Sequence, residues 1–172
     1  RINRRQRQMC IRDRLSLEAP CVPGRMELAG IKKNNAKIFI DFAHTPDALA
    51  NVLKEAREMC KGKLHVVFGC GGDRDKEKRP VMGKIATKYA DKIIITDDNP
   101  RNEDPDITRK EIIGISKNIQ EISDRRSAIK YAADSLKKHD ILVIAGKGHE
   151  KYQIIKNKSL PFDDVQISKK YL

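Results

Sequence analysis

The sequence lacks tryptophan, and only 5% of its 172 residues are aromatic. No apolar stretch approaches the roughly twenty residues that a membrane-spanning helix needs, and no segment has the pattern of a secretory signal peptide. The four cysteines have no metal-ligand spacing, and a chain of this length does not need disulfides to fold. We therefore expect a soluble cytoplasmic protein with reduced thiols and no metal ligands of its own.

Positive charge is distributed unevenly along the chain, whose formal net charge is +12. Much of the excess lies between Arg1 and Arg14, where Asp13 is the only acidic residue. Basic clusters can bind nucleic acids by releasing counterions from phosphates, but no aromatic platform or known binding motif accompanies this cluster. We therefore expect no nucleic-acid partner, and we keep a basic nucleic-acid-binding module as an alternative.

Residues 1–21 lack hydrophobic periodicity and differ in composition from everything downstream. We expect them to be a disordered or junction segment. The remaining residues, 22–172, are enough for one medium-sized domain with a real hydrophobic core.

Four short apolar runs, each followed by a polar or glycine-rich loop, organise this domain. The runs cover residues 37–40, 64–68, 93–96 and 141–145, and the loops cover residues 41–47, 69–75, 97–101 and 146–150. If the runs are parallel strands of one sheet, all four loops emerge at the same edge, where open α/β sheets bind ligands. The function is therefore expected at that edge.

Helical spacing between the runs predicts that strands and helices alternate. Helices are predicted over residues 45–60 and 79–89, and from Asp104, Asp124 and Asp163 onward. The helix from Asp104 should bury Ile107, Ile112 and Ile115. Further strands are predicted over residues 26–31, before an Asn34–Asn35 turn, over 119–122 and, at a sheet edge, over 152–155. The pattern predicts an α/β fold with a largely parallel sheet, flanking helices and an N-terminal hairpin.

Two of the loops have both a structural and a functional interpretation. The segment from Gly69 to Arg74 can let a ligand approach backbone amides, or it can be a tight turn; it is not a P-loop, because Gly-x-x-x-x-Gly-Lys-Ser/Thr occurs nowhere. In Asp98-Asn99-Pro100-Arg101, the planar guanidinium of Arg101 suits a carboxylate, but the segment can also be an Asx-type turn with Arg101 in solvent.

The loop after the last apolar run, residues 146–150, is also open to two interpretations. Lys147 can be a surface charge and His149 a structural imidazole. Glu150, however, should share the sheet edge with Arg74 and Arg101. One carboxylate and two guanidiniums fit a zwitterionic amino acid with more than one carboxylate.

Five segments together resemble a known family. They read VPGRME at residues 22–27, DFAHTPD at 41–47, GCGGDRDK with KRP at 69–80, DNPR at 98–101 and GKGHE at 146–150. Their order and spacing resemble the C-terminal domain of Mur ligases, in particular members that add meso-diaminopimelate to the peptidoglycan stem peptide, over residues 22–172. Five motifs in register are far more specific than any one of them.

The resemblance implies a Rossmann-like domain of a bacterial, cytoplasmic, ATP-dependent amide ligase. In that family, ATP phosphorylates the D-glutamyl γ-carboxylate of UDP-MurNAc-L-Ala-D-Glu, and the amine of the incoming amino acid attacks the acyl phosphate. The implied ligands are thus ATP, Mg²⁺, UDP-MurNAc-L-Ala-D-Glu and meso-diaminopimelate. We expect a monomer.

Motif by motif, the resemblance assigns binding roles to individual residues. The implied contacts to meso-diaminopimelate are Arg74, Asp98, Asn99, Pro100, Arg101, Gly146 and Glu150. Arg101 with Asn99 should grip the far carboxylate, and Glu150 should pair with the distal ammonium; lysine would leave Arg101 without a partner. The implied ATP contacts are Arg25, Asp41 and His44, beside a Phe42 where the family often has tyrosine.

The family's N-terminal UDP-binding domain and central ATPase domain have no counterpart in this sequence. The P-loop and most magnesium ligands belong to that central domain, so we expect no catalytic residue here and no activity from the chain alone. The missing domains are the expected partners. The alternatives within the superfamily are a lysine-adding Mur ligase, a folylpolyglutamate synthase and a cyanophycin synthetase, and the Asp98–Arg101 motif argues against them.

Overall fold

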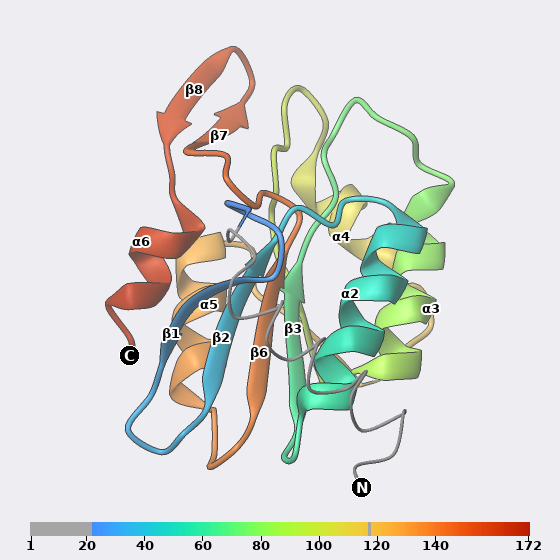
Figure 1. Cartoon of the computed structure of the whole chain (residues 1–172). Helices are drawn as coiled ribbons and strands as arrows, with labels where there is room; N and C mark the ends of the chain where they lie inside the picture. The colour runs from blue at the N-terminus through green and yellow to red at the C-terminus, as the bar shows by residue number, and fades with distance from the viewer. Residues whose placement is uncertain (1–21, 117) are drawn as a thin grey trace, which may run out of the picture.

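A computed structural model of the chain describes residues 22–116 and 118–172 (Figure 1). The predicted basic segment over residues 1–21 lies outside the described residues, and so do Cys10 and Cys21. Cys60 and Cys70 are free thiols.

The centre of the domain is a six-stranded sheet with the strand order β1-β2-β6-β3-β4-β5. Its strands are β1 (Glu27–Ile31), β2 (Lys37–Asp41), β3 (Leu64–Phe68), β4 (Lys92–Ile95), β5 (Ile119–Glu121) and β6 (Ile141–Ala145). Only β1 pairs antiparallel, with β2, through a turn in which Asn35 has a φ of 62°. The predicted largely parallel sheet and N-terminal hairpin are therefore confirmed.

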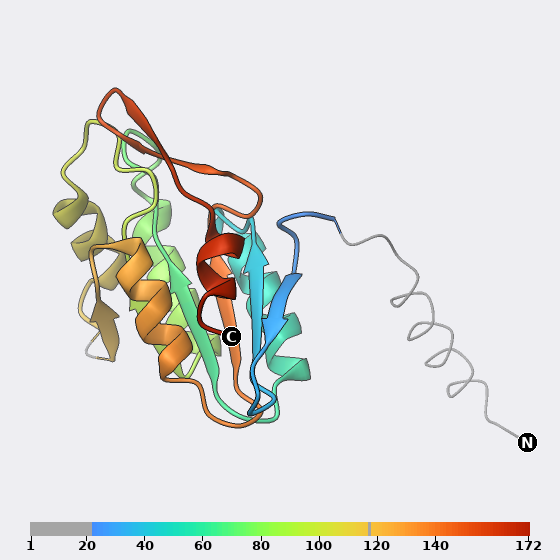
Figure 2. The same ribbon diagram turned by 90° about the vertical axis from the view of Figure 1, so that its left-hand side faces the viewer.

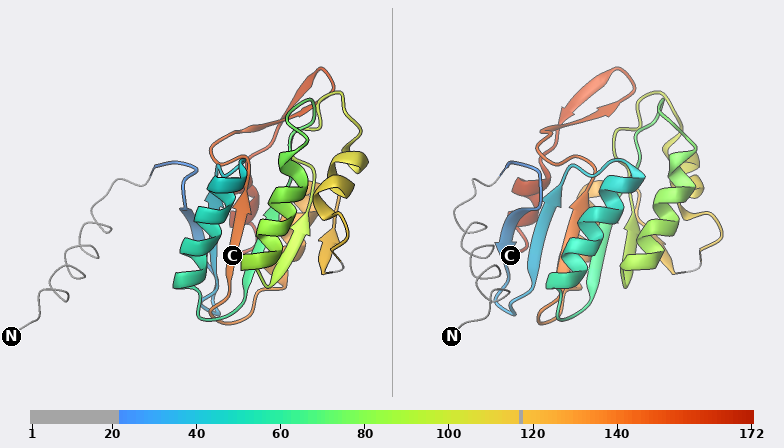
Figure 3. Two further views of the ribbon diagram at one scale, coloured as in Figure 1. Left: turned by 90° about the vertical axis from the view of Figure 1, so that its right-hand side faces the viewer. Right: turned by 45° about the vertical axis from the view of Figure 1, so that its right-hand side comes forward.

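Helices cover both faces of the sheet (Figures 2 and 3). They are α2 (Pro46–Met59), α3 (Lys78–Tyr89), α4 (Pro105–Ile113), α5 (Arg125–Asp134) and α6 (Asp164–Lys169). The predicted starts are confirmed, because the side chains of Thr45, Asp104, Asp124 and Asp163 each accept a hydrogen bond from the first turn. No helix in the described part of the chain is both long and apolar enough to cross a bilayer.

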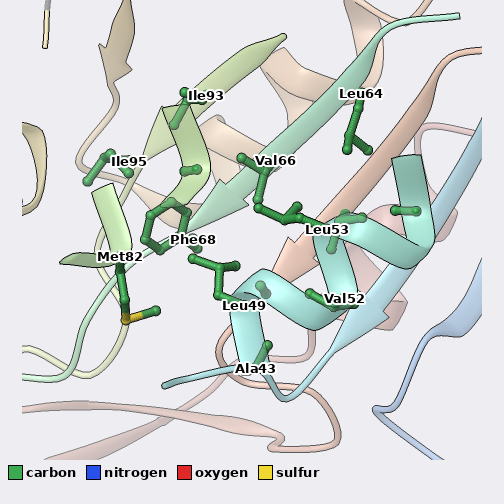
Figure 4. Packing of buried hydrophobic residues seen from close by; sticks show 14 of the residues in the cluster. Ala43, Leu49, Val52, Leu53, Leu64, Val66, Phe68, Met82, Ile93 and Ile95 are labelled. Atoms are coloured by element: carbon green, nitrogen blue, oxygen red, sulfur yellow. The ribbon is translucent and has the colours of Figure 1, made fainter. Parts of the chain in front are cut away.

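Alternation along the strands divides the core into two layers. In β3, Leu64, Val66 and Phe68 pack with Leu49 and Met82 of α2 and α3 (Figure 4). The next residue on the opposite face, Val67, packs under α5 and α6 in the second layer. All five β3 residues are buried, as expected for a central parallel strand covered on both faces.

The predicted buried side of α4 is wrong for two of its three isoleucines. Ile112 is buried, but Ile107 is 47% exposed and Ile115 is 99% exposed. Gly114, with a φ of 54°, ends the helix before Ile115, and the buried stripe runs through Thr108, Arg109 and Ile112. Helical periodicity turns Ile107 away from this stripe, so hydrophobicity alone gave the wrong face.

The predicted strand over residues 152–155 exists, but it does not extend the main sheet. β7 (Tyr152–Ile155) pairs antiparallel with β8 (Lys158–Pro161) in a separate two-stranded sheet, which projects from the domain (Figure 1). The Arg101 backbone bridges to β7, because its N–H donates to Ile154 O at 3.1 Å. The hairpin of β7 and β8 thus supports the loop that follows β4 through main-chain hydrogen bonds.

A fully buried ion pair joins α5 to α6. The Arg125 guanidinium donates to both carboxylate oxygens of Asp164, at 3.0 and 2.7 Å, and to Ala145 O at 3.1 Å. Both side chains have no solvent exposure. A charge in such a place is stable only while it keeps its partner.

We expect Asp164→Asn to lower the free energy of unfolding by about 3–5 kcal/mol, because it leaves the Arg125 charge buried without a counterion. Urea unfolding of the whole chain measures this. The matched control is Asp134→Asn, which breaks the exposed Lys130–Asp134 pair and should change little. Similar losses for the two variants would contradict a special role for the buried pair.

Candidate functional site

The loops that follow β2, β3, β4 and β6 surround a cavity with a volume of about 460 Å³. Each of these loops contributes to its lining, as expected for loops at the carboxyl edge of a parallel sheet. Among the lining residues are the predicted site residues Arg74, Asp98, Asn99, Arg101, Gly146 and Glu150. The remaining predicted contact, Pro100, is buried and does not line the cavity.

The tight packing of these loops depends on glycine. A Cβ on Gly72 would lie 1.9 Å from Pro100 O, so the loops after β3 and β4 can touch only through a glycine. Gly146 has a φ of 113°, and a Cβ there would lie 2.8 Å from Asp98 Oδ2. Pro100 therefore contributes to the site by packing, and Gly146 by its backbone conformation.

Arg101 is half-buried, which rules out the interpretation that its side chain lies free in solvent. Its Nη1 donates to Gly72 O at 2.9 Å, and its backbone has a φ of 53°. This conformation is unfavourable for a residue with a side chain, and it is held by hydrogen bonds to Ile154 and Lys156 of the hairpin. The position of the guanidinium is thus restricted both by its own hydrogen bond to Gly72 and by the backbone hydrogen bonds to the hairpin.

Lys147 is buried, and the interpretation of it as a surface charge is wrong. Its Nζ donates to Asn99 Oδ1 at 2.8 Å and to Glu150 Oε2 at 3.5 Å. The Asn99 Nδ2 also donates to Glu150 Oε2, at 3.2 Å. Burial lowers the pKa of Lys147. His149, in contrast, is exposed.

An ion-pair cluster that the sequence does not reveal connects the loop after β3 to the loop after β4. The buried guanidinium of Arg79 donates to both oxygens of Glu103, at 2.9 and 2.7 Å, and to Gly71 O at 3.3 Å. Glu103 also accepts the Asp73 N–H at 3.0 Å. In the sequence, Arg79 stands out as a helix start and as part of the KRP motif, but no local pattern marks Glu103 as its partner 24 residues away.

The three predicted ATP contacts do not share one cavity. Arg25 and Asp41 line a second cavity, also of about 460 Å³, whereas His44 lines the first. The Asp41 carboxylate accepts from Met26 N and Ala43 N, each at 2.7 Å, so it also supports the start of the domain. The His44 main-chain oxygen accepts from Lys78 Nζ at 2.8 Å.

A magnesium site does not fit the described residues. Within residues 22–116 and 118–172, no three His, Cys, Asp or Glu side chains are grouped so that they could hold a metal ion. Asp98 and Glu150 line the same cavity, but Glu150 has the ammonium of Lys147 beside it.

We expect Glu103→Gln to lower the free energy of unfolding by about 1.5 kcal/mol at pH 7, the order of one hydrogen bond to a charged group. The Arg79 guanidinium holds the pKa of the Glu103 carboxyl well below its usual range. Its contribution is therefore complete above the unfolded-state pKa of about 4.3 and declines as the pH falls below it.

Urea unfolding of both proteins between pH 7 and pH 3 checks this, and the difference between them should shrink toward the acid end. The control is Glu58→Gln, at an exposed position on α2. A difference that does not depend on pH would contradict the assignment.

Comparison with known proteins identifies the family. The family described as "Mur ligase, glutamate ligase domain" matches residues 24–148. A UDP-N-acetylmuramoyl-L-alanyl-D-glutamate–2,6-diaminopimelate ligase of Rickettsia montanensis is 56% identical over 158 residues, which are 90% of this chain and 32% of that protein.

Two solved structures are also similar. The structure of a UDP-N-acetylmuramoyl-L-alanyl-D-glutamate–2,6-diaminopimelate ligase superposes with a TM-score of 0.81 at 41% identity, covering 92% of this chain and 33% of that one. A folylpolyglutamate synthase/dihydrofolate synthase of Yersinia pestis, at 18% identity and a TM-score of 0.62, covers 77% of this chain and 30% of that one, and it shares the fold alone. The chain spans about a third of the length of these proteins, and it belongs to the Mur ligase family as the C-terminal, glutamate ligase domain.

Proposed function

We propose that the chain is the amino-acid-binding domain of an ATP-dependent ligase that adds meso-diaminopimelate to UDP-MurNAc-L-Ala-D-Glu in peptidoglycan synthesis. The observation that carries this proposal is the meeting of Arg74, Arg101 and Glu150 around one cavity, although they are far apart in sequence. The 56% identity to a relative of that name supports it.

The cavity has cationic and anionic groups for the two charges at the far end of such a ligand. The guanidinium of Arg101 and an N–H of Asn99 would bind the far carboxylate, and Glu150 would bind the distal ammonium. Lysine has no far carboxylate, so it would leave the half-buried Arg101 desolvated without an anionic partner. This asymmetry favours diaminopimelate over lysine.

The contribution of this domain to the reaction would be orientation. Amide formation requires the amine of the incoming amino acid to approach the activated glutamyl carboxyl in line, and a fixed cavity supplies that geometry. Arg25 and Asp41 would contact ATP from the second cavity, and His44 would do so from the first. Phosphorylation, the P-loop and the Mg²⁺ ligands would belong to other domains, so the chain alone would be an inactive, cytoplasmic monomer.

The alternatives have less support. A nucleic-acid-binding module would depend on the arginines between Arg1 and Arg14, which lie outside the described residues. The folylpolyglutamate synthase similarity is at the level of the fold. A lysine-adding ligase would not use the guanidinium that Arg101 places at the cavity.

We expect the whole chain to bind meso-diaminopimelate at least about tenfold more tightly than L-lysine in isothermal titration calorimetry. Arg101→Met should remove most of that preference, because it deletes the group that pairs with the far carboxylate. Arg126→Met, on the exposed side of α5, is the control and should keep the preference. Equal affinity of the unmodified chain for both amino acids would reject the proposed specificity.

A further inference from the structure

The side-chain amide of Asn99 has only one orientation that satisfies its neighbours. Its Oδ1 lies 2.8 Å from the Lys147 Nζ and 2.9 Å from the Ile154 N, and both of these atoms are donors. If the amide were turned over, its own N–H groups would face these two donors. Two independent donors, one from the loop after β6 and one from β7, therefore direct the amide nitrogen toward Glu150.

This orientation determines what Asn99 can offer to a ligand. One of its two amide hydrogens is used by Glu150 Oε2, at 3.2 Å, and Asn99 lines the cavity. Its oxygen is already occupied by two donors, so its free hydrogen-bonding capacity is a donor. A donor suits a carboxylate oxygen and disfavours an ammonium, which has only donors itself.

Lys147 also contacts Glu150. Both protein donors to Glu150, from Asn99 and Lys147, go to Oε2, and Oε1 has no hydrogen bond to any described residue. The charged groups that act on Lys147 are Asp98, Glu150 and Asp164 on one side and Arg125 on the other. Since Arg125 pairs with Asp164, the carboxylates left to face the Lys147 ammonium are those of Asp98 and Glu150, and Glu150 Oε1 is the atom available to a cationic ligand group.

We propose that Lys147 is a specificity-determining positioning residue. Its buried ammonium holds the Asn99 amide with an N–H available to the cavity, so that this part of the site favours the far carboxylate, which lysine lacks. This inference rests on the proposed amino-acid-binding function. Lys147 does not line the cavity, and the inference gives it a share of the discrimination between meso-diaminopimelate and lysine. Arg101 alone would otherwise provide that discrimination.

The first test compares Lys147→Met with the unmodified chain by calorimetry, using meso-diaminopimelate and L-lysine as ligands. We expect the variant to lose about tenfold in affinity for meso-diaminopimelate, because a tenfold loss corresponds to about one hydrogen bond to a charged group. Its affinity for lysine should change little. The control is Lys151→Met, because Lys151 is exposed in the same segment. An unchanged ratio of the two affinities in Lys147→Met would overturn the proposal.

A second measurement needs neither a variant nor a ligand. In the unmodified chain, the side-chain ¹³Cγ and ¹⁵Nδ2 resonances of Asn99 are followed by NMR while Lys147 is deprotonated at high pH. We expect them to move together with the Lys147 Nζ signal, since Asn99 Oδ1 is its hydrogen-bond acceptor. Asn99 resonances that do not respond to this deprotonation would refute the inference.

The two measurements separate the two claims. If the unmodified chain binds neither amino acid, the proposed function and the specificity role of Lys147 both fail, even if the Asn99 titration shows that Lys147 holds the amide. If the chain binds meso-diaminopimelate selectively and Asn99 does not respond to Lys147, the function stands and this inference fails.

Discussion

Hydrogen bonds between parallel strands align β2 and β3 on the two sides of β6, with Lys37 and Leu64 both paired to Ile141. β4 continues the register beyond β3. Because these strands run in the same direction, they end at the same level, and each chain segment leaving them turns over the same edge. Loops separated by more than a hundred residues in sequence are thereby brought around one cavity. Every later property of the site depends on this alignment.

Buried charges give that edge its fixed shape. Arg79, Arg125 and Lys147 have essentially no exposure. Arg79 and Arg125 each have a carboxylate partner from another segment of the chain, whereas Lys147 contacts Glu150 in its own loop and Asn99 in the loop after β4. Taking such groups out of water costs free energy, which is offset only where a counterion and hydrogen-bond acceptors lie in a suitable geometry around the charge. These pairs therefore contribute more to the arrangement of the loops than to the overall stability of the domain.

The lining of the cavity includes charges of both signs. Arg74 and Arg101 offer guanidiniums, Asp98 and Glu150 offer carboxylates, and the buried Lys147 contacts Glu150. The hairpin of β7 and β8 adds rigidity, because Gln153 Nε2 donates to Asp98 O at 2.7 Å and Ile154 N donates to Asn99. A segment expected to be a sheet edge thus supports the loop that follows β4.

The sequence alone determined the parts of this protein that depend on local chemistry. Apolar runs predicted the strands, cap residues such as Thr45 and Asp124 predicted the helix starts, and the common direction of the strands predicted which loops would lie together around the cavity. The resemblance carried by five motifs predicted the family.

Only the tertiary structure decided which side chains are buried and which partners they have. No local pattern distinguishes a buried Lys147 from a solvated one, or directs Arg79 to Glu103, because burial and pairing arise where distant segments meet. For the same reason, Ile107 and Ile115 look like core residues in sequence and are exposed in the fold, since the end of α4 and its packing face, and not their hydrophobicity, determine their environment.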